Sequence, residues 1–471
     1  MWFGYGRCRG LKYLHFSLLI VITWAIIACS NEMELNRERV TESPTKTNAL
    51  IIWWEKGFEL TEDEALQAIV NRWQEQTGNK VKLSFYTTSE LSEKIARAVK
   101  AGNPPDLVMN SSAERILYPR LAWEGKLEDV SALIEPVKEL YSENILKAIT
   151  YHNRVTGKRS YYGVPVYQST ILIFYWQKLL APIGLSEIDL PQDWDGFWQF
   201  WQQAQSKLKT QHDRNVYGLG FPYSGAEGAD DTYLLFEQIL EAYNVSLLNS
   251  QGKLLVNRPE VRQGIIKCLD WYTQFYQQGY VPPDAINWLN SENNRNLLNQ
   301  MVLMTPNNTL SIASAVRQDS ETYYNQLGIS EFPNKPNGEP MRYLTPIRQA
   351  VMPTNSVHKQ QAKDFLQYLI QPQIMTEYLK ASGSRNLPVQ SSVWLDSFWQ
   401  QTSDPYLALA TKVLTEGQTR LFYVVDHPAY SQVLKENIWG KTLNRIIVNK
   451  ISPEQAADEA IARIEEIFKQ W

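Results

Sequence analysis

The strongest constraint on the fold is the alternation of strand-like and helix-like segments at the start of the chain's body. Ala49–Trp54 is a continuous apolar run of strand length, and apolar residues recur at helical spacing over 66–73. Alternate positions are apolar over 81–85, and a second helical stretch over 89–101 leads to the short apolar run 106–109. Strands that alternate with helices predict an α/β layer, with a mostly parallel sheet covered on both faces.

Local signals predict where these elements begin and end. Thr61 and Glu64 have the spacing of a capping box, which predicts the start of the first helix, and Gly78 predicts its end. Further along, Val164–Tyr175 predicts one long strand that enters a second α/β region.

The rest of the chain is predicted to be mostly helical. A short strand is expected at Met301–Thr305, and strands are expected again within 327–353. Trp194, Trp198 and Trp201 fall on one face of a helix, which predicts that they belong to the core. Helices are predicted at 192–209, 229–243, 258–278, 358–370, 372–381, 405–416, 428–449 and 452–470.

The N-terminal segment has the layout of an export signal. Basic residues precede the apolar run Phe16–Ala28, and a small residue stands directly before Cys29. This run is shorter than the ~20 residues that a membrane-spanning helix needs. Ile26–Cys29 resembles the lipobox of bacterial lipoproteins, in which the cysteine is lipidated and becomes the new N-terminus.

We therefore predict a signal peptide over 1–28, lipidation of Cys29 and a polar tether over 29–47. The body of the protein is then expected in the periplasm, at the outer face of the cytoplasmic membrane. The alternative is that the apolar segment stays uncleaved as a transmembrane anchor.

Composition and motifs argue against several classes of function. The net charge of −4, without a basic block, argues against a nucleic-acid partner. The chain has no Cys-x-x-Cys pair and no His-x-x-x-His pair, so no metal and no cofactor is expected. It also lacks a nucleophile elbow and a P-loop, and we expect it not to be an enzyme. One catalytic alternative stays open, because Glu55 and the Asp230–Asp231 pair could supply the two carboxylates of a glycosidase.

Several segments, in this order and spacing, resemble the extracellular solute-binding proteins of ABC importers, of the maltose-binding, carbohydrate type. The resemblance runs from about Asn48 to Trp471. It rests on Ile51–Trp53 with Lys56–Phe58, Asn103–Val108, Tyr162–Pro165 with Ile171–Tyr175, Leu303–Asn308, Ala362–Leu369 with Gly383 and Leu387–Val389, and Ile451–Ala460.

The resemblance implies a two-lobed periplasmic-binding-protein fold. Each lobe would hold a mixed, mostly parallel sheet flanked by helices, with a hinge of several strands and a helical C-terminal region. The N-terminal lobe would take 48–167 and 327–353, and the C-terminal lobe would take 168–326 and 354–471. A monomer would capture a sugar in the cleft between the lobes and deliver it to the permease subunits of an ABC importer.

The resemblance also suggests which residues contact the ligand. A sugar needs an aromatic plate and a rim of polar groups that bond its hydroxyls. Trp53 is expected in the core, because it points away from Trp54 in an alternating strand. The candidates are Trp54, Glu55, Lys56, Asn110, Ser111, Tyr167, Gln168, Phe221, Tyr223, Asn307, Asn308, Arg348 and Arg385.

Two other functions and one other ligand class remain as alternatives. The chain could be a secreted glycoside hydrolase or lyase that uses a carboxylate pair, or a solute sensor that signals to a membrane partner. Tyrosines and amides among the candidates favour a neutral sugar. Lys56 with Arg348 or Arg385 would instead suit an anion of the glycerol-3-phosphate type.

Overall fold

The computed structural model describes residues 48–383 and 385–471. The predicted signal peptide (1–28), the lipidation site Cys29 and the tether (29–47) lie outside the described residues. Within the described part of the chain, no helix is both long enough and apolar enough to cross a bilayer.

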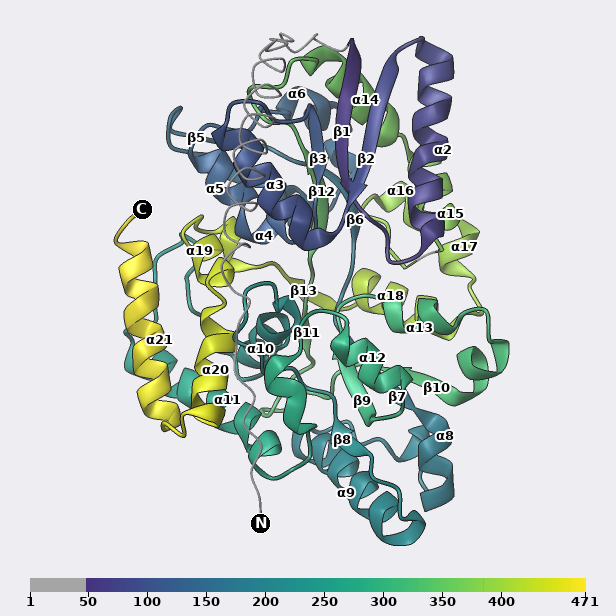
Figure 1. The fold of residues 1–471 in the computed structure, drawn as a ribbon, viewed down its shortest axis with the longest axis vertical. Helices are drawn as coiled ribbons and strands as arrows, with labels where there is room; N and C mark the ends of the chain where they lie inside the picture. The colour runs from purple at the N-terminus through teal and green to yellow at the C-terminus, as the bar shows by residue number, and fades with distance from the viewer. Residues whose placement is uncertain (1–47, 384) are drawn as a thin grey trace, which may run out of the picture. The chain divides into compact units, whose positions relative to one another are not determined.

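The first sheet confirms the predicted α/β layer at the start of the body (Figure 1). Its strand order is β2 (Lys80–Tyr86), β1 (Ala49–Glu55), β3 (Leu107–Met109), β12 (Ile347–Val351) and β6 (Val164–Gln168). β1 pairs in parallel with β2 and β3, whereas β12 runs antiparallel to both of its neighbours. The sheet is therefore mixed, and the expectation of a mostly parallel sheet holds only for the strands near the N-terminus.

The two helices next to this sheet begin close to their predicted positions. α2 spans Leu60–Thr77 and ends at Gly78, whose φ of 72° suits a glycine. Its capping box is formed by Glu59 and Glu62, two residues before the predicted pair Thr61 and Glu64. α3 spans Thr88–Lys100. The shifted cap matters for function, because it places the Glu62 carboxylate at the start of α2.

The second sheet has the order β10 (Leu327–Ser330), β7 (Leu172–Trp176), β9 (Val302–Asn307) and β8 (Tyr217–Leu219), and only β8 and β9 pair in parallel. The prediction of one strand over 164–175 was wrong. β6 ends at Gln168 in the first sheet, and β7 begins at Leu172 in the second. Residues 169–171 thus carry the chain from one lobe to the other.

The second lobe is rich in helices, as the apolar periodicity predicted. α9 (Trp194–His212) packs against β8 and β9 of the second sheet. α11 (Pro259–Gln277) packs between α10 (Asp230–Ala242) and α21 (Pro453–Phe468). Trp194, Trp198 and Trp201 are buried, which confirms their assignment to the core. The single helix predicted over 428–449 is instead two helices, α19 (Tyr430–Lys435) and α20 (Ile438–Val448). They are separated because Asn437 has a left-handed φ of 47°.

The structure corrects three segments of the predicted lobe boundaries. Strands β10 and β11 (Arg342–Leu344) were assigned to the N-terminal lobe, but β10 pairs with β7 of the second sheet and β11 packs against α10. Helices α14 (Lys359–Leu369) and α15 (Pro372–Ala381) were assigned to the C-terminal lobe but pack against α2 of the first. The chain returns to the second lobe at α18 (Pro405–Thr415), which packs against β10.

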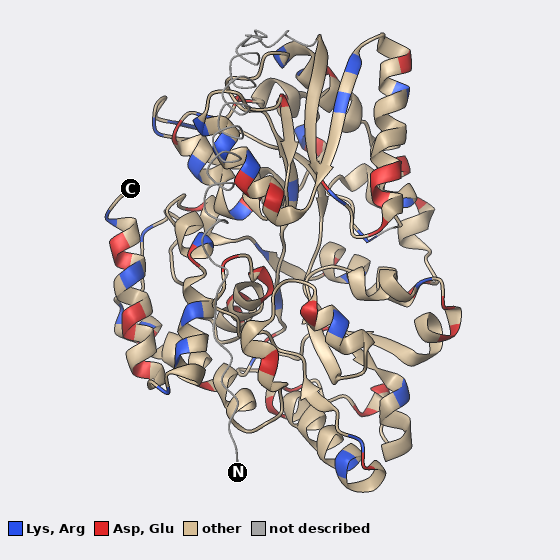
Figure 2. Ribbon diagram, viewed as in Figure 1, with Lys and Arg blue, Asp and Glu red and all other residues tan. Residues whose placement is uncertain are grey.

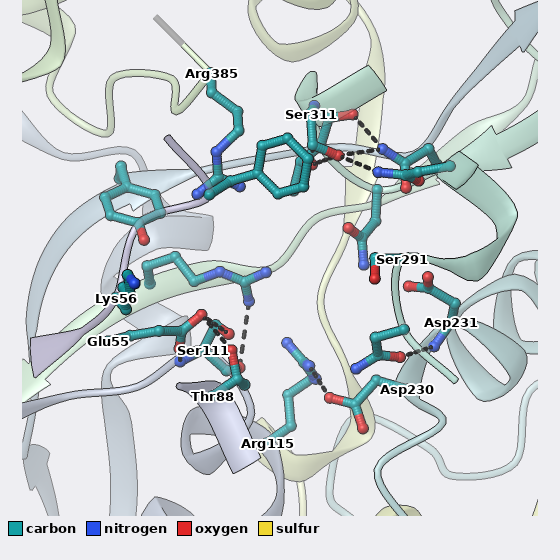
Figure 3. Close-up of a pocket in the computed structure, with 18 residues that line it drawn as sticks. Glu55, Lys56, Thr88, Ser111, Arg115, Asp230, Asp231, Ser291, Ser311 and Arg385 are labelled. Atoms are coloured by element: carbon teal, nitrogen blue, oxygen red, sulfur yellow. Dashed lines mark hydrogen bonds and ion pairs between the residues drawn. The ribbon is translucent and has the colours of Figure 1, made fainter. Parts of the chain in front are cut away.

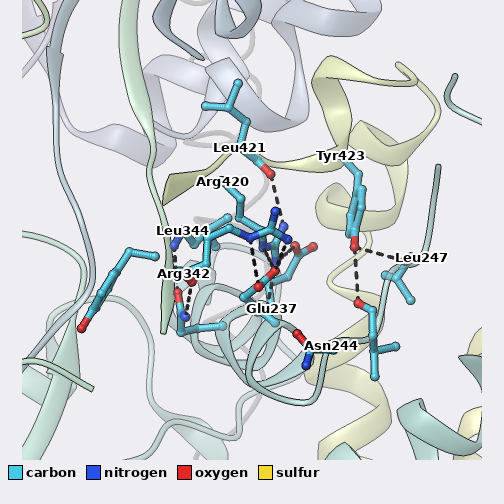
Figure 4. A network of polar contacts seen from close by, with 12 residues as sticks. Glu237, Asn244, Leu247, Arg342, Leu344, Arg420, Leu421 and Tyr423 are labelled. Carbon is cyan, nitrogen blue, oxygen red and sulfur yellow. Dashed lines mark hydrogen bonds and ion pairs between the residues drawn. The ribbon is translucent and has the colours of Figure 1, made fainter. Parts of the chain in front are cut away.

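A buried polar network inside the second lobe ties α10 to the strand pair β11 (Arg342–Leu344) and β13 (Gln418–Arg420) (Figure 4). Arg420 lies 3.1 Å from a Glu237 oxygen and 3.3 Å from a Glu241 oxygen. Glu241 also binds Arg342 at 2.7 Å and Lys335 at 2.8 Å. Each buried charge has an opposite partner, as burial requires.

Charged residues of both signs are interspersed on the outer elements (Figure 2). Lys80 and Lys82 lie on the edge strand β2, where charge discourages pairing with another chain.

The remaining α-helices and strands are short. They are α4 (Ala113–Ile116), α5 (Tyr118–Trp123), α6 (Ser131–Ile134), α7 (Glu143–Ala148), β4 (Thr150–Asn153), β5 (Lys158–Tyr161), α8 (Gln177–Leu180), α12 (Glu292–Leu298), α13 (Ser311–Val316), α16 (Ser391–Trp394) and α17 (Ser397–Gln400).

Candidate functional site

A cavity of about 190 Å³ lies where loops of the two lobes meet. Figure 3 shows Glu55 and Lys56 on one side of it and Asp231 and Ser291 on the other. The first lobe contributes Glu55, Lys56, Phe58, Thr88, Ser111, Arg115, Tyr167, Arg348 and Arg385. The second lobe contributes Asp230, Asp231, Asn290, Ser291, Asn294, Asn307, Asn308, Thr309 and Ser311.

The structure brings eight of the thirteen predicted contact residues together around this cavity. They come from the end of β1, the turn after β3, β6, β9, β12 and the segment after α15. These residues are Glu55, Lys56, Ser111, Tyr167, Asn307, Asn308, Arg348 and Arg385. Their contact with a ligand stays a prediction.

Trp54 does not line the cavity. Alternate residues of β1 are buried, and Trp54 is 2% exposed within the main core. Trp53, predicted as core, is the more accessible of the two, packs edge-on against Tyr86 and lies under the Lys94 amine. Both faces of β1 are covered, so alternation alone did not show which tryptophan lies deeper.

Phe221 and Tyr223 are also buried away from the cavity. Both side chains are fully buried in an aromatic cluster around Tyr272. The Tyr223 hydroxyl donates a hydrogen bond to the Tyr272 carbonyl oxygen at 2.8 Å. The loop after β8 turns into the lobe, where the Tyr223 amide binds the Ala285 carbonyl oxygen. The structure thus places both rings in the core and not at the cavity, where they were predicted to stack on a ligand.

Asn110 and Gln168 hold loops in place rather than line the cavity. The Asn110 side chain donates to the Thr88 carbonyl oxygen at 2.8 Å and accepts from the Ala113 amide at 2.7 Å. The Gln168 side chain donates to the Pro388 carbonyl oxygen at 2.6 Å. Both amides thereby position segments that carry cavity residues.

Three basic side chains, Lys56, Arg348 and Arg385, form what we call the basic wall. Arg385 binds Glu62 through two nitrogens, at 2.8 and 2.6 Å, and its guanidinium carbon lies 5.9 Å from the centre of the Phe58 ring. Arg348 binds the buried Glu114 and, at 3.4 Å, the Ser111 carbonyl oxygen. The carboxylates thus fix the direction in which both guanidinium groups point.

Glu55 is held by its neighbours. Its carboxylate accepts hydrogen bonds from the Thr88 hydroxyl at 2.9 Å, the Ser111 hydroxyl at 2.7 Å and the Ser111 amide at 2.5 Å. This set of donors fixes the orientation of the carboxylate beside Lys56.

A buried ion pair crosses between the lobes at the edge of the cavity. Arg115 of α4 donates to Asp230 of α10 at 3.0 Å and to the Tyr233 hydroxyl at 3.0 Å. Burial lowers the pKa of Arg115, but the neighbouring Tyr233, Asp230 and Glu114 together raise it above its ordinary value. Arg115 therefore stays charged and links the two lobes.

Asp231 has no ion partner among residues 48–383 and 385–471. Burial, together with the adjacent Asp230, raises its pKa to about 7. Burial also raises the pKa of Glu114 to about 7, although Arg348 and Arg115 oppose this effect.

The opposite side of the cavity is lined by amides and hydroxyls, and we call it the amide wall: Asn290, Ser291, Asn294, Asn307, Asn308, Thr309 and Ser311. Asn294 and Asn307 donate to the Ser311 hydroxyl at 2.8 and 3.0 Å. Within the described residues, the buried side-chain oxygen (Oδ1) of Asn294 has no hydrogen-bond partner. The wall therefore offers donors and acceptors that suit a ligand rich in hydroxyls.

Sequence reasoning missed ten residues of the lining. Phe58 had a usable signal, because it belongs to a segment that carries the family resemblance. Asp230 and Asp231 were singled out only as a possible catalytic pair, and the polar run from Asn290 to Asn294 drew no prediction. Among the described residues, no group of histidines, cysteines and acids is arranged to hold a metal ion.

Comparisons with known proteins agree with this arrangement. The family model of bacterial extracellular solute-binding proteins matches residues 57–376. An ABC transporter solute-binding protein from Thermotoga lettingae, bound to α-D-tagatose, is 20% identical with a TM-score of 0.73; the match covers 89% of this chain and all of that one. Maltose-bound MalE3 of T. maritima is 16% identical with a TM-score of 0.70 over 89% and 100% of the two chains.

The GacH receptor of Streptomyces glaucescens, solved unliganded and with acarbose, is 14% identical with a TM-score of 0.68 over 90% and 99%. No curated protein sequence matches the chain. At these identities the structural likenesses establish the shared two-lobed fold, which matches almost the whole length of the related chains.

Proposed function

The chain belongs to the bacterial extracellular solute-binding proteins, and we propose that it captures a small sugar or related polyol and passes it unchanged to an ABC importer. One observation carries this proposal: the lining of the cavity is shared between two lobes that are joined by crossing segments. A ligand that contacts both lobes favours the closed arrangement over the open one. The importer then recognises the closed form.

The chemistry of the lining supports a polyol as the ligand. Amides and hydroxyls on one side can bond ligand hydroxyls, while Phe58 offers an apolar face to a sugar ring. Similar structures hold tagatose, maltose and acarbose, which are all rich in hydroxyls. The eight predicted residues around the cavity, led by Glu55 and Asn307, are our proposed contacts.

We place the protein outside the cytoplasm, as its family implies. We further propose that a lipid on Cys29 anchors it to the outer face of the cytoplasmic membrane and that it acts as a monomer. The partner would be the permease subunits of the importer. A sensor that shares this fold would instead contact a signalling protein.

One observation favours a second candidate, glycoside hydrolysis. Glu55, Asp230 and Asp231 all line the cavity, and the pKa of Asp231 is raised to about 7, which suits a general acid. Against it, Asp230 is committed to Arg115, and three donors hold Glu55. Binding of a ligand that stays unchanged is consistent with all of these contacts and needs no chemical step.

Residues 30–471 can be tested against a panel of sugars and polyols. We expect at least one compound to bind by calorimetry, to shrink the radius of gyration in solution scattering and to be recovered unchanged. Steady formation of product would support hydrolysis instead. Binding without any compaction would contradict capture by lobe closure.

A further inference from the structure

We propose that the ligand is an anionic polyol, whose carboxylate or phosphate is held by Lys56, Arg348 and Arg385. This inference rests on the proposed function and narrows it to one class of solute. It follows from the charge and the hydrogen bonding of the cavity.

Several nitrogen atoms of the basic wall are not engaged by protein acceptors. Arg385 uses two of its three guanidinium nitrogens on Glu62, and Arg348 uses one on Glu114 and Ser111. Lys56 is exposed and has no ion partner within residues 48–383 and 385–471. The remaining N–H groups of three cations therefore stand at one side of a single small cavity. Such groups bind carboxylate and phosphate oxygens strongly.

The charged side chains that line the cavity are four cations, Lys56, Arg115, Arg348 and Arg385, and three acids, Glu55, Asp230 and Asp231. Glu62 and Glu114 each pair with one arginine of the wall. Glu55 accepts three hydrogen bonds from Thr88 and Ser111, and Asp230 pairs with Arg115. Lys56 forms no ion pair among the described residues, although Glu55 is adjacent to it and Asp63 lies near enough to feel its charge. In a half-buried cavity its ammonium group can pair with a ligand anion, because charges interact more strongly there than in water.

The charges of Arg385 and Arg348 also act on Tyr167, an aromatic residue of the lining. Tyr167 is buried, which raises the pKa of its hydroxyl well above the usual value, while Arg385 and Arg348 act in the opposite direction. Its hydroxyl has no hydrogen-bond partner among the described residues and can donate to an anion. Tyr167 thus adds a neutral donor beside the two arginines.

The far side of the cavity suits the other end of such a molecule. Asn294, Asn307 and their neighbours offer amides and hydroxyls, and Asp231 stands on this side (Figure 3). An anion placed here would be repelled by Asp231, whereas ligand hydroxyls can donate to it. The ligand therefore lies with its anionic group toward the basic wall and its hydroxyls toward the amide wall.

The cavity has room for about one ring beside the basic wall. Its volume is about 190 Å³, less than the ~300–1,000 Å³ of pockets that hold drug-sized ligands. Thr88, Asp230, Asn290 and Ser291 also line a neighbouring pocket of about 770 Å³. Phe58 and Tyr167 are the aromatic side chains of the cavity lining. A chain of several sugar rings would need more stacking surface than these two rings provide.

The test uses one ring with different charges: glucose, glucosamine, glucuronate and glucose 6-phosphate, with glycerol and glycerol 3-phosphate as a smaller pair. Binding to residues 30–471 is measured by calorimetry at low and high salt. We expect at least one anion to bind tenfold or more tighter than its neutral counterpart, with an affinity that falls as salt rises. Comparison of glucuronate with glucose 6-phosphate shows whether the site prefers a carboxylate or a phosphate.

Lys56→Gln is the matched variant, because Lys56 is exposed and its loss leaves the fold intact. It should weaken binding of the anion tenfold or more, whereas Lys469→Gln, at an exposed lysine far along the chain, should change it less than twofold. The proposal is overturned if neutral compounds bind as tightly as anions, or if Lys56→Gln leaves the affinity for the anion unchanged.

The test can refute the anionic class of ligand without refuting the proposed function. Neutral sugars that bind and compact the protein would leave the proposed function standing and remove only the anionic class. If no anion and no neutral compound of a wide panel binds or compacts the protein, both are contradicted.

Discussion

Arg115 and Asp230 form a buried ion pair, 3.0 Å between nitrogen and oxygen, that joins α4 of the first lobe to α10 of the second beside the cavity. The pair favours, without a ligand, the arrangement of the lobes in which Arg115 and Asp230 are in contact. It therefore contributes to the balance between arrangements that a ligand shifts.

Loss of this pair should open the lobes. Asp230→Asn removes one of the two acids that pair with Arg115 and leaves Glu114 at 2.9 Å, so we expect it to cost less than the ~3–5 kcal/mol of a buried charge left alone. Because separation of the lobes lets water reach Arg115, we expect a larger radius of gyration without ligand and an affinity at least tenfold weaker. Scattering and calorimetry measure both. Asp364→Asn, at an exposed acid of α14, serves as the control, and an unchanged radius would argue against the link.

Phe58 should contribute to ligand binding more than to stability. Its ring is 44% exposed beside Arg385 at the cavity. Phe58→Ala should weaken binding of the identified ligand by ~1–3 kcal/mol, as expected for an aromatic contact. The midpoint of urea unfolding should move little. Phe398→Ala, at a ring that is 37% exposed on α17, should leave the affinity as it was. Equal affinities of the two variants would remove Phe58 from the site.

Tyr223 should behave in the opposite way. Tyr223→Phe deletes a buried hydroxyl that donates to the Tyr272 carbonyl oxygen, and a hydrogen bond of this kind is worth ~1 kcal/mol net. We expect the free energy of unfolding in urea to fall by about 1–2 kcal/mol while the ligand affinity stays the same. Tyr324→Phe, at a tyrosine that is 55% exposed, should change neither. Weakened ligand binding with unchanged stability would restore Tyr223 to the site.

Asp231 should make stability depend on pH. Its pKa of about 7 in the fold exceeds the ordinary 3.8, so the folded state keeps a proton that the unfolded chain has already released between these values. The free energy of unfolding should therefore fall as pH rises from 5 to 7, by about 2 kcal/mol from this group. In the Asp231→Asn variant, the free energy of unfolding should fall by about 2 kcal/mol less over the same pH range.

Urea unfolding of both proteins at pH 5, 6, 7 and 8 measures this difference. Glu114 also titrates near pH 7, but it is present in both proteins, so its contribution cancels in the comparison. Identical pH profiles would mean that Asp231 ionises freely in the folded protein.

The sequence predicted elements well wherever a local pattern decided them. The periodicity of α2 and α3, the alternation in β2 and the end of the first helix at Gly78 are local properties, and the structure agrees with them. The errors fall where a tertiary contact intervenes. The strand predicted over 164–175 is divided between two sheets, and a left-handed Asn437 divides a predicted helix.

The sequence by itself determined the α/β class, the family and most of the loops that meet at the cavity, because these depend on patterns and spacings along the chain. Only the tertiary structure decided which side chains face the cavity. Trp54 and Tyr223 are buried, whereas Phe58 and Asp231 line the site, and no local pattern distinguishes them. The physical reason is that other elements pack against both faces of the strands and against the loops that follow them. The depth of a side chain then depends on elements that pack from distant parts of the sequence.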